Sequence, residues 1–528
     1  MILVSLSSGL NASTPKSVLI AFILGRVVGS AESRIMKQRV WLVTCAGVGA
    51  AILACVLAGC PGIPGIDTPG TNGKSLHERL FTEALDGGFT GTDSCITCHG
   101  TVACAVAETA HWLWQGEVAN IDGLEGEIHG KRDLLNNFCI AVPSNEGRCT
   151  QCHAGFGWKS KSYDFTDGTQ VDCLVCHDNT GTYVKHPTAN GGGGDPAFKV
   201  DGEFVLATTE DLKEVAYSVG PPTRKNCGFC HFNAGGGDNV KHGDLSSALV
   251  NPTAEMDVHM GGLDFTCQKC HTEEDHGIAG NALHSVTEGA EAASCTRCHG
   301  ETNVHQNDPV VGPILNFHTR VACESCHIPA FARQLPTKVE WYWDEAGQDI
   351  SPIPTDTYGK PLYDKKKGRF VWQKDVVPTL LWFDGKWDRM VIGVSDTFTE
   401  AGTAADPVVI AAPTATQDTP GAKLYPFKKM IGRQPADAVN DRLVVPHLFG
   451  KGPGENPFWA KFDWDLAIQE GTAYAGQEYS GQYTFVNTVM YLKVSHEIAP
   501  AGQARACTDC HGVESFWTQI GLDDPLPG

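Results

Sequence analysis

Eight copies of the pattern C-x-x-C-H run through this chain and constrain its fold more than any other feature. Two thiols three positions apart can form thioethers with the two vinyl groups of one porphyrin, and the histidine that follows can bind its iron. Zinc sites and disulfides do not require that histidine, so the pattern predicts eight c-type haems. The sixteen cysteines are Cys95, Cys98, Cys149, Cys152, Cys173, Cys176, Cys227, Cys230, Cys267, Cys270, Cys295, Cys298, Cys323, Cys326, Cys507 and Cys510. The eight histidines are His99, His153, His177, His231, His271, His299, His327 and His511.

So many haems leave little polypeptide for a conventional core. Without its leader the chain has roughly 60 residues per haem, too few for a separate hydrophobic core around each. We therefore expect stacked porphyrins to supply much of the buried apolar surface. The predicted fold is mainly α with long loops and a few short hairpins, a multihaem cytochrome c fold scaffolded by eight covalently bound haems.

Residues 1–59 predict a leader. Residues 1–35 fit no obvious purpose and are interpreted as a mis-start, whereas residues 36–59 combine a basic start with an apolar run. That run ends in Leu-Ala-Gly followed by Cys60, which resembles a lipobox and predicts a lipid anchor on Cys60. In the alternative, an ordinary signal peptide, Cys60 is incidental. We expect an exported protein, either periplasmic or a membrane-anchored lipoprotein facing the periplasm or exterior, because c-type haem attachment belongs to oxidising compartments.

The rest of the chain divides according to its motifs. Residues 60–90 predict a flexible tether, since their first part is rich in Pro, Gly and Thr. Residues 91–330 carry seven motifs and residues 506–528 carry the eighth. Between them, residues 331–505 carry none and are expected to pack on the haem core.

The haem-free region offers two turn or loop signals. Asp384-Gly385 between apolar runs predicts a two-residue hairpin, and the Pro/Ala/Thr-rich residues 401–421 predict a loop. Basic residues gather beyond that loop, where a solvated loop is favoured over an entry path for anions. They are Lys423, Lys428, Lys429 and Arg433.

The formal net charge of -21 argues against a nucleic-acid partner, because no basic patch with interleaved aromatic residues is visible. An acidic surface suits a basic electron donor, such as a donor cytochrome or a quinol-oxidising membrane complex. The charge is equally consistent with keeping an exported protein soluble.

Histidines outside the motifs are the expected second ligands of the haem irons. A histidine close to a motif cannot easily reach the opposite face of the same porphyrin, so it is expected to bind a neighbouring haem. The weakest candidates are His77, His186 and His447. The predicted ligands are His111, His129, His242, His259, His276, His284, His305, His318 and His496.

A glycine run after the fourth motif carries the candidate catalytic residues. Residues 235–237 are all glycine, which lets the backbone approach a flat macrocycle closely. Asp238 and Lys241 follow at i and i+3 and share a face if a helix or turn continues. Lys241 is favoured as an iron ligand over a surface lysine beside a ligating His242, and Lys159 is its rival.

Several phrases of the sequence resemble the octahaem tetrathionate reductase family, which is related to pentahaem nitrite reductase and hydroxylamine oxidoreductase. The resemblance covers essentially the whole mature chain. The phrases are NNFC at 136–139, RCTQCH at 148–153, VDCLVCHD at 171–178, NCGFCHF at 226–232 and DNVKHGDL at 238–245.

The resemblance implies seven haems with two histidine ligands and one catalytic haem. The catalytic haem would be held by Cys149, Cys152 and His153, with Lys241 as its distal ligand. The pocket beside it would be lined by Asp238, Asn136 and Cys139. The family also implies a small oxyanion or related substrate, such as tetrathionate, nitrite or hydroxylamine.

Three alternatives stay open. Cys139 could form a disulfide with Cys104 instead of offering a thiol to the pocket. The protein could be an electron conduit without a substrate, or a hydroxylamine-type oxidoreductase whose catalytic porphyrin is cross-linked to a tyrosine. The C-terminal tyrosines, which are expected on a helix that delivers His496, are Tyr474, Tyr479, Tyr483 and Tyr491.

Overall fold

The computed structural model divides the chain into two units, Met1–Asp67 and Thr68–Gly528. The residues it describes all belong to the second unit. The expected leader, Cys60 and His284 lie outside the described residues. The described ranges are 75–83, 89–189, 193–280, 293–300, 304–315, 318–452, 454–511 and residue 517.

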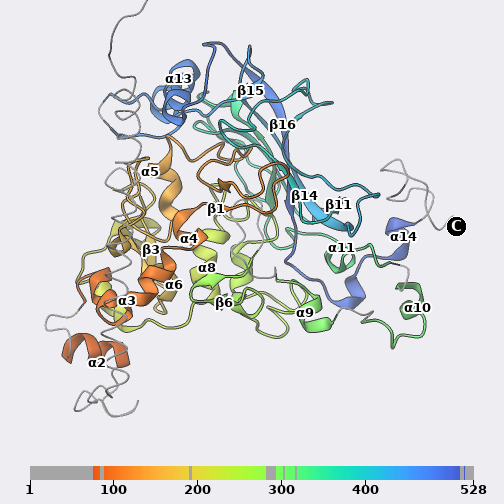
Figure 1. Ribbon diagram of the computed structural model, residues 1–528, viewed down its shortest axis with the longest axis horizontal. Coiled ribbons are helices and arrows are strands. Elements are labelled where there is room, and N and C mark those ends of the chain that lie inside the picture. The colour runs from red at the N-terminus through yellow and green to blue at the C-terminus, as the bar shows by residue number, and fades with distance from the viewer. Residues whose placement is uncertain are drawn as a thin grey trace, which may run out of the picture. The chain divides into compact units, whose positions relative to one another are not determined.

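The C-x-x-C-H motifs lie in helical turns, most of them in short helices and one in the 15-residue helix α3 (Figure 1). Local caps start some of them. The Asp172 side chain accepts from the Val175 amide, and Thr223 and Asn226 form a capping box. The helical segments that contain the motifs are α3 (Thr92–Val106), α5 (Glu146–Cys149) with η1 (Thr150–Cys152), α6 (Cys173–His177), α8 (Arg224–His231), η5 (Cys267–Lys269), α9 (Thr296–His299), α11 (Cys323–His327) and α14 (Cys507–Cys510).

The other helices are short, apart from α13. In the described ranges none is long and apolar enough to cross a membrane. They are α2 (Leu76–Glu83), α4 (Ala110–Leu113), α7 (Leu212–Tyr217), α10 (Val311–Leu315), α12 (Phe458–Lys461) and α13 (Trp464–Ala475).

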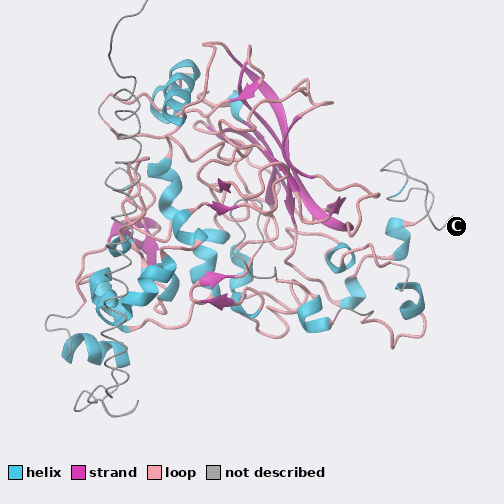
Figure 2. Ribbon diagram, viewed as in Figure 1, coloured by secondary structure: helices cyan, strands magenta, loops and turns pink. Residues whose placement is uncertain are grey.

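All strands of a nine-stranded sheet lie in the haem-free region, so the prediction of a mainly α fold is wrong (Figure 2). The order is β12-β13-β16-β14-β8-β10-β9, and β11 and β15 also pair with β14. The strands are β8 (Thr337–Tyr342), β9 (Tyr363–Asp364), β10 (Gly368–Gln373), β11 (Thr379–Phe383), β12 (Trp387–Arg389), β13 (Val408–Pro413), β14 (Lys423–Asp437), β15 (Arg442–Leu443) and β16 (Tyr483–Lys493).

Strand β14 is the centre of this sheet. It pairs antiparallel with β16 from Phe427 opposite Lys493 to Asp437 opposite Tyr483, and parallel with β8 on its other side. The basic residues predicted to lie in a solvated loop are therefore in a central strand, and Lys428 is completely buried. The prediction failed because neighbouring lysines of this strand lie on opposite faces of the sheet: Lys428 is buried and Lys429 is exposed.

The Asp384-Gly385 turn lies between two strands, but these strands do not pair with each other as a hairpin would. Strand β11 pairs with β14, and β12 pairs with β13. Strand β13 itself falls within the predicted loop 401–421. A larger sheet offers each strand a better-matched neighbour than a local hairpin does, and a turn signal cannot reveal this.

Three smaller sheets lie outside the haem-free region. Their strands are β1 (Gly116–Glu117) with β2 (Ile128–His129), β3 (Tyr183–Lys185) with β4 (Pro196–Val200) and β5 (Glu203–Leu206), and β6 (Glu273–Glu274) with β7 (Gly277–Ile278).

The largest hydrophobic cluster joins the large sheet to two loops near the candidate pocket. Trp341, Phe427 and Met430 contribute from the sheet, while Phe138 and Val240 contribute from segments close to Cys139 and Lys241. The core of the sheet thus continues directly into the loops that carry the candidate catalytic residues.

Candidate functional site

Seven of the eight motif histidines face a second histidine, with ring centroids 6.0–6.4 Å apart. Two imidazoles that bind one metal ion from opposite sides, each through a bond of about 2 Å, have centroids about 6 Å apart. The residues therefore fit haem irons with two axial histidines. The pairs are His99 with His77, His231 with His111, His177 with His276, His299 with His259, His271 with His496, His327 with His305, and His511 with His318.

Several of these rings are oriented as iron ligands would be. The Nδ1 atom of His177 lies 2.9 Å from the Gly220 carbonyl, and that of His271 lies 2.9 Å from the Ala279 carbonyl. A bond at Nδ1 fixes the tautomer and leaves Nε2 free for a metal.

Asp244 orients another histidine in the same way, and sequence reasoning missed it. Its Oδ2 atom lies 3.1 Å from His496 Nδ1 and accepts from the backbone amides of Ser495 and His496. A carboxylate behind a ligating histidine is a common second partner in metal sites. Its place three residues after Lys241 gave no signal of this contact across the fold.

The outcome for the other candidate histidines differs. His77 was ranked among the weakest, yet it forms a pair with His99. His129 was a predicted ligand, but both of its ring nitrogens lie against carboxylates, 3.0 Å from Asp133 and 3.1 Å from Glu127. This geometry contradicts a ligand role for His129. His242 does not belong to any of the seven pairs, and its ligand role stays a prediction.

His153 is the motif histidine outside these pairs among the described residues. Its ring lies among aromatic side chains, 5.0 Å from both Trp112 and Trp158 between centroids. Its Nε2 atom is 2.7 Å from the Trp112 carbonyl, while Nδ1 is buried without a partner. Burial lowers the pKa of His153 to about 3. The ring thus turns Nε2 toward the backbone, unlike His177 and His271, and its predicted bond to iron would require this contact to exchange.

Lys241 lies near this same motif. Burial lowers the pKa of Lys241 well below its usual range, Lys131 and Arg389 lower it further, and Cys152 and Cys139 act in the opposite direction. A neutral amine has a lone pair that can bind a metal. The rival Lys159 is exposed.

Cys139 is close to both sides of the candidate pocket. Its Sγ lies 3.8 Å from the position that a Cβ on Gly236 would occupy, and its charge helps to raise the pKa of Cys149 to about 12, after burial. Cys139 is a free thiol whereas Cys104 is disulfide-bonded, so a Cys104–Cys139 disulfide is excluded. The sixteen motif cysteines are also free, as thioether formation requires.

Cationic side chains surround Cys139. Burial raises the pKa of the Cys139 thiol, and Lys367, Arg148, Lys338 and Lys131 oppose that rise, in this order. Lys338 is buried, with its Nζ 3.2 Å from the ring centroid of Phe370. Burial lowers the pKa of Lys338 well below its usual range, and Lys367 forms an ion pair with Asp364 at 3.3 Å. Lys131 and Arg148 are thus the cations near Cys139 that favour an anionic ligand.

Asp238 and Asn136 make hydrogen bonds that the sequence did not indicate, and their place in the pocket stays a prediction. Asp238 binds the backbone amide of Ser247 at 2.9 Å and also its hydroxyl, so its carboxylate is not directed to Lys241. Asn136 accepts from the Cys139 amide at 2.7 Å and donates to the Ile140 carbonyl at 2.9 Å. It shapes the turn that presents Cys139.

Cysteines of different motifs lie near one another, and these neighbours give the motifs a spatial order. One series runs through the motifs of His511, His327, His299, His271 and His231. From His231 it branches to the motif of His153 and to that of His177, and the motif of His99 follows that of His177. The neighbouring thiols are Cys510 and Cys326, Cys323 and Cys295, Cys298 and Cys270, Cys267 and Cys227, Cys230 and Cys152, Cys227 and Cys176, and Cys173 and Cys95.

Paired histidines beside paired thiols, repeated along one chain, define a multihaem c-type cytochrome. Comparison with known proteins agrees. The family described as "Cytochrome c bacterial" matches residues 338–514. The crystal structure of octahaem cytochrome c from Shewanella oneidensis is 39% identical with a TM-score of 0.71, and the match covers 84% of this chain and 96% of that chain. The chain belongs to the octahaem c-type cytochromes.

A more distant relative is an uncharacterised protein of Archaeoglobus fulgidus. It is 26% identical over 254 residues, which are 41% of this chain and 84% of the relative. This relative carries no information about the substrate.

Proposed function

We propose that this protein carries eight c-type haems and reduces small sulfur or nitrogen compounds, such as tetrathionate, nitrite or hydroxylamine, at the haem held by Cys149 and Cys152. One observation carries the proposal. Seven motif histidines have a histidine opposite them, whereas His153 has none among the described residues and Lys241 lies near its motif. A site with a weaker ligand is where a substrate can enter.

The side chains around this site have definite tasks. Haem supplies single-electron chemistry and an exchangeable coordination position. Lys241 would help to hold this haem through its amine, because burial lowers its pKa well below the usual range, and a substrate would displace it. The free amine would then take up a proton from solvent, offset the charge of the bound anion and pass the proton to the product. Lys131 and Arg148 draw the anion toward Cys139.

The other seven haems provide the electrons. Each would be held by two histidines, and such a site has no free position for a substrate. The series of motifs converges on that of His231, whose Cys230 contacts Cys152. Electrons can therefore reach the substrate one after another without the release of intermediates.

The protein is also proposed to be exported and to receive electrons from a donor cytochrome or a quinol-oxidising membrane complex. A lipid on Cys60 would hold it at the membrane. Membership of the c-type cytochromes supports export, because haem attachment takes place in an oxidising compartment.

Turnover of tetrathionate, nitrite and hydroxylamine with a reduced dye as donor tests the reductase directly. We expect activity with at least one of them, and in Lys241→Ala a loss of about 10²–10⁴-fold, typical for a positioned acid. Eight haems should stay attached in this variant, and one should become high-spin because its sixth ligand is gone.

Lys159→Ala is the matched control, and it should leave both the spectrum and turnover unchanged. Wild-type protein with eight low-spin haems and no response to any of the three substrates would support an electron conduit instead. A change of spin state in Lys159→Ala, with none in Lys241→Ala, would move the ligand to Lys159.

A further inference from the structure

Strand β14 reaches the Lys241 segment through one buried side chain. The Nζ atom of Lys428 donates to the carbonyl of Val240 at 2.7 Å and to that of Lys241 at 3.1 Å. It also lies 2.7 Å from the Thr337 hydroxyl on β8. One lysine of the sheet thus binds two consecutive carbonyls of the candidate ligand segment.

Thr337 extends this contact by one residue. Its hydroxyl donates to the Asn239 carbonyl at 2.5 Å, and the Asn239 side chain donates to the Leu335 carbonyl at 2.8 Å. Asn239 has a positive φ of 59°, a conformation that needs support from its surroundings. Three consecutive residues, 239–241, are therefore fixed by donors and acceptors of the sheet.

Burial of the Lys428 amine costs folding free energy that its packing contacts alone do not offset. Its side chain is fully buried, and its three acceptors are two carbonyls and one hydroxyl, none of them a carboxylate. Asp244 acts on Lys428 through its charge but is not one of these acceptors. Burial of an amine or ammonium without a counter-charge in direct contact opposes folding, and an apolar side chain would fill the same space without that cost. Such a group is expected where it fixes something that matters for function.

We propose that Lys428 is a positioning residue for the Lys241 amine. Lys428 binds the carbonyls of Val240 and Lys241, one on each side of the Lys241 Cα. It thereby holds the Lys241 backbone, and hence the reach of its side chain, at one distance from the Cys149–Cys152 haem. The inference rests on the proposed function, since it requires Lys241 to be the ligand.

The sheet holds the opposite side of the pocket through the same strand. The Asn137 side chain donates to the Met430 carbonyl at 2.7 Å, two residues beyond Lys428. Asn137 is fully buried and lies within the turn that presents Cys139. Strand β14 thus binds both the segment that carries Cys139 and the segment that carries Lys241, and it thereby sets the distance between them.

The test is the ligand spectrum of Lys428→Met, which keeps the length of the side chain and removes the donor. We expect eight attached haems, unchanged signals from the histidine-paired haems and a partly high-spin catalytic haem. Turnover should fall by about 10–10²-fold, since a displacement near 1 Å costs that order of rate. Lys428→Gln, which keeps a shorter donor, should recover part of both signals.

Lys429→Met is the matched control, because Lys429 is the exposed neighbour on the same strand. It should leave spectrum and turnover unchanged. In the double variant Lys241→Ala/Lys428→Met, the catalytic haem should be the same as in Lys241→Ala alone, because Lys428 acts only through Lys241.

A folded Lys428→Met protein with the wild-type spectrum would overturn the inference. If this variant does not fold, Thr337→Val decides, since it keeps Lys428 and removes one of its acceptors. We expect a smaller shift toward high spin, and no shift would also overturn the inference. An unchanged spectrum in Lys241→Ala would instead refute the proposed function itself.

Discussion

The direction of the ring nitrogens distinguishes candidate iron ligands from other histidines more clearly than the distance of a histidine from a motif does. His177 and His271 direct Nδ1 to a carbonyl, which leaves Nε2 available for a metal, whereas His153 directs Nε2 to the Trp112 carbonyl. The attachment sites could be predicted because five consecutive residues encode the whole chemistry. The pairs could not, because partners such as His271 and His496 are brought together only by the fold.

His77 and His129 provide a direct test of this criterion. We expect His77→Ala to convert one haem, that of Cys95 and Cys98, to a high-spin state, because the second axial ligand of that haem is removed. His129→Ala should leave all haem signals unchanged, because its ring is bound to Asp133 and Glu127. Low-temperature electron paramagnetic resonance would measure both. The opposite pattern would restore His129 as a ligand.

At the level of elements, the helices of the motifs could be predicted and the large sheet could not. Strand β14 contains Pro426 and Pro435, which argue against a strand, and it buries the polar side chains of Lys428 and Gln434. Its sequence therefore lacks the alternation of apolar and polar residues on which strand prediction depends. The candidate residue Cys139 was indicated by resemblance to a family and Lys241 also by the glycine run before it, but their link to the sheet had no signal in the sequence.

The end of β14 gives a prediction about stability and pH. Burial alone would raise the pKa of Asp437, but hydrogen bonds from Ser480, Val439 and Asn440 lower it from 3.8 to about 2. A carboxyl group with a lowered pKa in the folded state stabilises the protein above its unfolded pKa, and this contribution is lost as pH falls toward the folded pKa.

We therefore expect Asp437→Asn to lower the free energy of unfolding by about 2 kcal/mol at neutral pH. The difference from wild type should shrink as pH falls from about 4 to about 2. Denaturant unfolding at a series of pH values would measure it, with the exposed Asp418→Asn as control. A difference that does not depend on pH would contradict the assigned cause.

For the molecule as a whole, the charges are divided between surface and pocket. The chain has a net charge of -21, while cations gather around Cys139. In the proposed function, the overall charge would act on a protein donor at long range, and the local cations would act on a small anion at short range.

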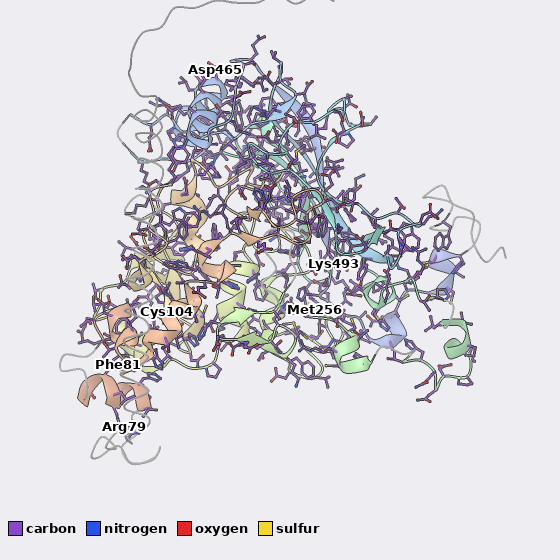
Figure 3. The ribbon with its side chains drawn as sticks, viewed as in Figure 1. Arg79, Phe81, Cys104, Met256, Asp465 and Lys493 are labelled. Atoms are coloured by element: carbon purple, nitrogen blue, oxygen red, sulfur yellow. The ribbon has the colours of Figure 1, made fainter. Side chains whose placement is uncertain are left out.

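The sheet also connects the candidate pocket with the paired histidines. Strand β16 ends at Lys493, which is labelled in Figure 3, and His496, the partner of His271, follows three residues later.

This division of charge predicts that salt affects two donors differently. Reduction by a basic cytochrome should slow by about tenfold or more as ionic strength rises from roughly 0.01 to 0.15 M, because the screening length shortens from about 30 to about 8 Å. Reduction by a small neutral dye should change little. Stopped-flow absorbance of the haems would compare them, and equal salt dependence would argue against electrostatic docking of the donor.

The link between Lys428 and Lys241 also orders events in time. The two residues are 187 positions apart, and a chain is synthesised from its N-terminus at about 5–20 residues per second, so Lys428 emerges roughly 10–40 s after Lys241. Seven of the eight attachment motifs are complete before the strand that fixes the pocket exists. A chain truncated before β14 would therefore carry seven of the eight attachment motifs but lack the strand that fixes the Lys241 segment, so haem attachment and completion of the candidate site are separable.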